Sequence, residues 1–96
     1  MDNRRKHQRH ECSVTAKVHT AFGTFQCSIV DISISGVGIG ATHDHLVSLK
    51  RDDYVTLEIP EFGVREMELK WTGSGKFGAE LTRPLDDQEL ESLVGR

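Results

Sequence analysis

Hydrophobic and polar residues alternate along most of the chain from residue 13 onward. A period of two places successive side chains on opposite faces of a β-strand, so the alternation predicts strands. The segments that show it are residues 14–18, 25–29, 37–41, 55–59, 67–71 and 77–81. Each has one apolar face, which predicts an antiparallel barrel or sandwich around a single core. Trp71 and Phe77 fall on apolar positions and are expected in that core.

A helix is predicted after the last strand. Pro84 ends the strand, Asp86 can cap a helix, and Glu89 follows three residues later as in a capping box. Apolar residues at or near helical spacing are Leu85, Leu90, Leu93 and Val94. So short a helix needs a packing surface, either the open end of the barrel or a partner chain. Residues 44–49 fit either a loop or a single helical turn.

Ninety-six residues predict one domain, spanning 1–96. We expect a basic, flexible arm over 1–10, the barrel over 13–82 and the helix over 86–95. No apolar run approaches the roughly 18 residues that cross a bilayer, so no membrane insertion is expected. The charged start lacks the apolar region of a signal peptide, which predicts a cytoplasmic protein.

Charge is distributed unevenly, although the net charge is only −3. The first ten residues contain Arg4, Arg5, Lys6 and Arg9 against Asp2, so the remainder is acidic. An acidic body repels long polyanions, and we therefore expect no nucleic acid polymer as a partner. A small anion held by the arm avoids that repulsion.

The arm carries arginines four residues apart, Arg5 and Arg9. The planar guanidinium binds phosphate with two parallel hydrogen bonds, fits the Hoogsteen edge of guanine and stacks on purines. A solubilising terminus would also explain a basic arm, so this pattern alone leaves both interpretations open.

A second candidate motif follows the second predicted strand, with Asp31 and Ser33 alternating with Ile32 and Ile34. If the isoleucines point into the core, the carboxylate and hydroxyl share the outer surface. Alternatively, Asp31 and Ser33 stabilise a turn. Glycines alternate just beyond, at positions 36, 38 and 40. They indicate either a bare face against which a flat ligand can lie, or bends at a barrel corner.

No catalytic, metal or cofactor site is predicted. The chain has neither a GxSxG elbow nor a phosphate-binding loop with lysine. His43 and His45 lack a nearby third metal ligand. Cys12 and Cys27 are too far apart for a CxxC pair and are expected to be reduced thiols.

The two motifs together resemble those of the PilZ domain, a bacterial receptor for the second messenger cyclic di-GMP. That family is marked by RxxxR near the N-terminus, here Arg5 to Arg9, and by [D/N]xSxxG after the second strand, here Asp31, Ser33 and Gly36. The separation of the motifs is typical of the family. The resemblance covers essentially the whole chain and implies a six-stranded antiparallel β-barrel with a short C-terminal helix.

The resemblance also implies a binding site and a role. The implied contacts to cyclic di-GMP come from Arg4, Arg5, Arg9, Asp31, Ser33, Gly36 and Gly38. The arginines would bind phosphates and guanine edges, the carboxylate and hydroxyl would hydrogen-bond guanine or ribose, and the glycines would let the ligand approach the backbone. An arginine just before the motif favours an intercalated ligand pair, which often accompanies a homodimer.

The expected function is therefore that of a non-enzymatic receptor or adaptor that signals through a protein partner or by assembly. Two alternative functions are also compatible with the sequence. One is a PilZ-like interaction module that has lost nucleotide binding, and the other is a small barrel that binds single-stranded nucleic acid. The acidic body and the low aromatic content of 6% argue against the second alternative.

Overall fold

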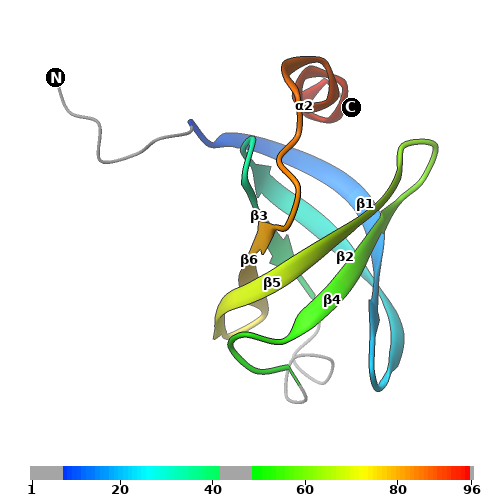
Figure 1. The fold of residues 1–96 in the computed structure, drawn as a ribbon, viewed down its shortest axis with the longest axis vertical. Helices are drawn as coiled ribbons and strands as arrows, with labels where there is room; N and C mark the ends of the chain where they lie inside the picture. The colour runs from blue at the N-terminus through cyan, green and yellow to red at the C-terminus, as the bar shows by residue number, and fades with distance from the viewer. Residues whose placement is uncertain (1–7, 42–48, 96) are drawn as a thin grey trace, which may run out of the picture.

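A closed antiparallel barrel of six strands forms the body of the protein in the computed structural model, which describes residues 8–41 and 49–95 (Figure 1). The elements are β1 (His10–Thr20), β2 (Gly23–Ile32), β3 (Gly36–Gly40), β4 (Tyr54–Ile59), β5 (Gly63–Gly73), β6 (Lys76–Leu81) and α2 (Asp87–Val94). The strand order around the barrel is β1-β2-β3-β6-β5-β4. The barrel and its six strands are confirmed, as is the C-terminal helix. Arg4, Arg5 and nearly all of residues 44–49 lie outside the described residues.

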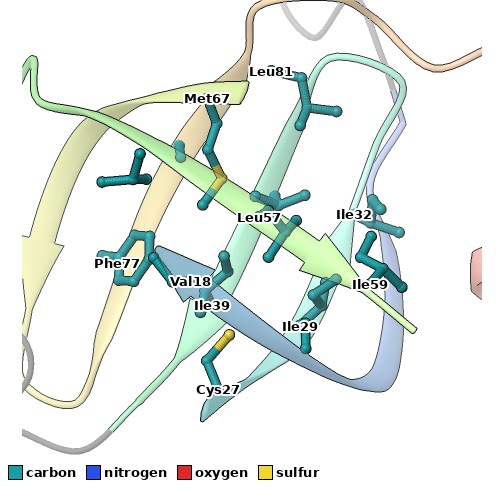
Figure 2. Packing of buried hydrophobic residues seen from close by; sticks show 14 of the residues in the cluster. Val18, Cys27, Ile29, Ile32, Ile39, Leu57, Ile59, Met67, Phe77 and Leu81 are labelled. Atoms are coloured by element: carbon teal, nitrogen blue, oxygen red, sulfur yellow. The ribbon is translucent and has the colours of Figure 1, made fainter. Parts of the chain in front are cut away.

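The apolar faces of the strands meet inside the barrel, where their side chains point toward one another (Figure 2). Fully buried members from different strands include Val18, Ile29, Ile39, Leu57, Leu69 and Phe77. Phe77 is the largest of them by volume, and its burial confirms the prediction that it belongs to the core. Polar residues at the alternate positions are left on the outer surface of the barrel, where the candidate site lies.

One aromatic residue does not follow the predicted alternation. The register between β5 and β6 shifts between Leu69, which pairs with Ala79, and Trp71, which pairs with Gly78. Two residues of β5 therefore oppose one residue of β6, which is a β-bulge. The extra residue turns Trp71 outward, so that it is 48% exposed. The prediction that Trp71 belongs to the core is wrong for this reason.

The helix α2 lies beyond one end of the barrel and packs against β1 (Figure 1). Asp86 accepts a hydrogen bond from the backbone of Glu89, and the Glu89 side chain accepts one from the backbone of Asp86, so the predicted capping box is present. Leu93 is completely buried. Glu89 also pairs with Arg65, whose guanidinium lies 4.9 Å from the centre of the Phe62 ring. These contacts fix the helix to the β4–β5 hairpin.

The turn between β2 and β3 is bonded to the segment that leads into the helix. The carbonyl of Ser35 accepts a hydrogen bond from the amide of Leu81 at 2.8 Å, and the carbonyl of Ile34 accepts one from Leu85 at 2.8 Å. The second predicted motif therefore lies at the end of the barrel that α2 covers.

No helix in the described ranges combines the length and the apolar character needed to cross a membrane.

Candidate functional site

Arg9 and Asp31 form an ion pair that joins one residue of each predicted motif. Arg9 directly precedes β1, and Asp31 is near the end of β2, where the two strands are paired. Nε and Nη2 of Arg9 both donate to Oδ1 of Asp31, at 2.9 and 2.6 Å. The side chains are 40% and 24% exposed. A pair this exposed adds about 1 kcal/mol or less to folding stability, so its geometry matters more for binding than for the fold.

Glycines in β3 leave room for this ion pair. A Cβ atom at Gly38 would lie 2.5 and 2.8 Å from the two carboxylate oxygens of Asp31, which is too close for any side chain. A Cβ atom at Gly36 would lie 3.5 Å from Nη1 of Arg9. The expectation of a bare face therefore needs correction at Gly38, because the Asp31 carboxylate occupies the space above it.

Ser33 does not face the outer surface, contrary to expectation. It is 2% exposed, and its hydroxyl accepts a hydrogen bond from the amide of Gly36 at 3.0 Å. The backbone amide of Ser33 also donates to the carbonyl of Gly36 at 2.8 Å. The alternation fails here because β2 ends at Ile32 and a period of two holds only within a strand. The alternative interpretation, in which Ser33 stabilises a turn, is the one that the structure supports.

Replacing Ser33 by alanine is expected to lower the free energy of unfolding by about 1–2 kcal/mol, because the amide of Gly36 loses its buried acceptor. Urea denaturation followed by circular dichroism measures this loss. Ser74→Ala is the comparison, since Ser74 is exposed in the turn between β5 and β6. Equal stability of wild type and Ser33→Ala would contradict the structural role.

A shallow pocket of about 230 Å³ opens beside the ion pair, on the outer surface of β3, β6 and β5. Its lining consists of Arg9, Ser35, Gly36, Val37, Lys70, Trp71, Gly78, Ala79 and Glu80. Drug-sized ligands usually occupy 300 Å³ or more, so a pocket of this size suits one flat group, such as a base, of a larger ligand.

Trp71 lies directly over Gly78 at this pocket. A Cβ atom at Gly78 would collide with the indole ring, with Nε1 and Cε2 as the nearest atoms. The sequence interpretation assigned no binding role to Trp71 or Gly78. A glycine at an outward position of a strand, next to an aromatic residue of the neighbouring strand, was the signal that could have identified them.

Lys70 and Glu80 line the pocket and belong to a charged cluster that also includes Glu68, which lies outside the lining. Nζ of Lys70 lies 3.4 Å from Oε1 of Glu68 and 3.5 Å from Oε1 of Glu80. Desolvation acts to lower the pKa of Lys70, but the hydrogen bonds and charges of the two carboxylates outweigh it and raise the pKa. Lys70 therefore remains a cation at neutral pH and separates two carboxylates that face each other across β5 and β6.

The lining of the pocket includes neither of the two cysteines. Both are free, and burial raises the pKa of each thiol, that of Cys27 to about 12. The charge of Asp31 adds a smaller upward shift at Cys12. Both thiols are thus protonated and weakly nucleophilic at neutral pH. Over residues 8–41 and 49–95, no three His, Cys, Asp or Glu side chains gather as a metal site would require.

Comparison with known proteins gives one family and several similar folds. The family model described as PilZ domain matches residues 3–95. None of the curated proteins matches the sequence significantly.

Among solved structures, the inhibitor of motility MotI/DgrA of Bacillus subtilis is similar with a TM-score of 0.69 at 14% identity, over 96% of this chain and 48% of that one. This chain thus spans about half the length of that protein. The PilZ domain of CeSA from a cellulose-synthesizing bacterium is similar with a TM-score of 0.66 at 18% identity, over 93% of this chain and 92% of that one. At such low identities the likeness is one of fold.

Proposed function

The chain belongs to the PilZ domain family, and from that premise we propose that it is a non-enzymatic receptor for cyclic di-GMP. The ion pair of Arg9 and Asp31 at the edge of the Trp71 pocket is the observation that carries this proposal. It places a preoriented guanidinium next to an aromatic ring on the outer surface of the barrel. A guanidinium binds phosphate or a guanine edge, and an indole ring provides a stacking surface for a base.

Asp31 acts on the ligand chiefly by holding Arg9 in place. Because two N–H groups of Arg9 donate to Oδ1, the guanidinium is fixed before the ligand arrives, and less side-chain entropy is lost on binding. Nη1 lies over Gly36 at the pocket. In this proposal Gly36 and Gly38 make room for the ion pair, and Ser33 supports the turn beneath it.

In this proposal the arm supplies the excess positive charge that the surface around the pocket lacks. In the described part of the site, two cations, Arg9 and Lys70, face three carboxylates, those of Asp31, Glu68 and Glu80. This surface alone does not attract a ligand with two phosphates. The sequence places further cations at residues 4–6, separated from Arg9 by two residues. We therefore assign a base to the pocket and the phosphates to the arm, whose ordering over the ligand would create a surface for a protein partner or a second copy.

Arg9→Ala is expected to weaken binding of cyclic di-GMP about 30-fold. Removing one partner of a charged pair at a binding site typically costs about 2–5 kcal/mol, and about 1.4 kcal/mol corresponds to a factor of ten. Calorimetric titration of wild type and variant measures the change. Arg51→Ala is the matched control, because Arg51 is exposed in the turn before β4 and does not line the pocket.

Absence of heat with wild type at tens of micromolar ligand would overturn the proposed function and favour an interaction module without nucleotide binding. Equal affinities of wild type and Arg9→Ala would overturn the assigned site. Measuring the molecular mass before and after saturation tests whether the ligand produces a homodimer. The carboxylates at the pocket give no support to a barrel for single-stranded nucleic acid, which needs a positively charged groove.

A further inference from the structure

We infer that Glu80 is a specificity-determining residue that selects guanine over adenine in the Trp71 pocket. This inference rests on the proposed function, because it concerns the base of the same ligand. Glu80 belongs to neither predicted motif and lies on β6, where it pairs with Gly36 of β3 and lines the pocket.

The position of Glu80 follows from the alternation along β6. Phe77, Ala79 and Leu81 are buried, and the residues between them, Gly78 and Glu80, therefore occupy outward positions. Gly78 lies under the Trp71 ring, and Glu80 follows two residues later on the same face. A base stacked on the exposed indole would therefore have the Glu80 carboxylate near its edge.

Glu80 is the one carboxylate among the described residues that line this pocket. The carboxylate of Asp31 is not part of that lining, and its Oδ1 accepts both bonds from Arg9. The side chain of Glu80 is 57% exposed and has Lys70 Nζ 3.5 Å from Oε1. It is therefore accessible to a ligand, and the ammonium group restrains its position.

The chemistry of a carboxylate distinguishes the two purines. An ionised carboxylate only accepts hydrogen bonds. Guanine presents two adjacent donors on its Watson–Crick edge, N1–H and the N2 amino group, which match the two oxygens. Adenine presents an acceptor, N1, beside its amino group, so one carboxylate oxygen would face a lone pair. An amide group donates as well as accepts, and it pairs with adenine through two bonds.

The test compares the affinities of cyclic di-GMP and cyclic di-AMP for wild type, Glu80→Gln and Glu68→Gln. Glu68→Gln is the matched control, because it removes the same charge from the other partner of Lys70 without altering the pocket lining. Discrimination by a bidentate contact is about 1–3 kcal/mol, so Glu80→Gln should reduce the preference for cyclic di-GMP about tenfold or more. Glu68→Gln should leave the preference as in wild type.

Each outcome decides the matter. A preference reduced in Glu80→Gln alone supports the inference. An unchanged preference, or an equal reduction in both variants, overturns it while leaving the receptor function intact, since wild type still binds cyclic di-GMP. No binding of cyclic di-GMP by wild type overturns the proposed function together with the inference. Glu80 is exposed and the substitution is isosteric, and thermal unfolding of both variants checks that the barrel is unchanged.

Discussion

Gly38→Ala is expected to weaken cyclic di-GMP binding about 100-fold or more while leaving a folded barrel. The new Cβ would lie 2.5 Å from Oδ2 and 2.9 Å from Cγ of Asp31, so the carboxylate must leave its position. Arg9 then loses the acceptor of both of its hydrogen bonds. In contrast to Arg9→Ala, which only removes a side chain, this variant leaves a displaced carboxylate and an unfixed guanidinium that obstruct the site, so the loss should exceed that of Arg9→Ala and fall within the range of about 2–5 kcal/mol for charged contacts.

Gly40→Ala is the matched control on the same strand. It adds the same methyl group two residues further along β3, where the nearest atom, Cγ1 of Val30, would be 3.6 Å away. Calorimetric titration gives the affinity of each variant, and circular dichroism shows whether each is folded. If both glycine variants bind as wild type does, Asp31 does not need its position above Gly38, and the preorientation of Arg9 is not what determines affinity.

Gly78→Ala should also weaken binding about 100-fold, through displacement of Trp71. The methyl group would occupy the place of the indole ring, and a backbone held between β3 and β5 cannot move aside. Stacking of a base on an aromatic side chain contributes about 1–3 kcal/mol. We expect the upper end of that range, because the displaced ring remains attached next to the pocket. Trp71 is the only tryptophan of the chain, so its fluorescence reports the displacement even without ligand.

Gly73→Ala provides the comparison for this variant. A Cβ atom there would lie 3.8 Å from Cζ3 of Trp71, an ordinary contact, so both the fluorescence and the affinity should stay as in wild type. A double-mutant cycle with Trp71→Ala completes the design, since Gly78→Ala should cost little once the ring is gone. Additive losses in the cycle would show that Gly78 acts on binding by a route other than Trp71.

Much of the fold could be predicted from the sequence because a strand with one buried face must keep its apolar residues at every second position. This constraint located all six strands and the buried positions of Val18, Leu57 and Phe77. The N-terminal cap of the helix could also be predicted from the sequence, because the side chains of Asp86 and Glu89 accept hydrogen bonds from backbone amides only three residues away. Family resemblance supplied what periodicity did not, the closure of the strands into a barrel.

The candidate site was less predictable because it depends on departures from regular alternation. Nothing in the sequence of residues 67–71 marks the bulge that turns Trp71 outward. Ser33 continues the alternation of polar and apolar residues in the sequence, although the strand β2 ends at Ile32. The approach of Asp31 to Gly38 depends on how neighbouring strands pair, which is a property of the sheet and not of either segment. Local patterns thus found the motif residues but not the neighbours that orient them.

The bonds from Leu81 and Leu85 to the β2–β3 turn couple the opening of this turn to the opening of the C-terminal segment. Opening that turn exposes the carbonyls of Ile34 and Ser35 and at the same time releases the chain that leads into α2. Local opening of hydrogen-bonded segments occurs in cooperative units, and here one such unit contains segments far apart in sequence. A molecule that holds the turn closed from the arm side would thereby also slow fraying of the C-terminal segment, without touching it.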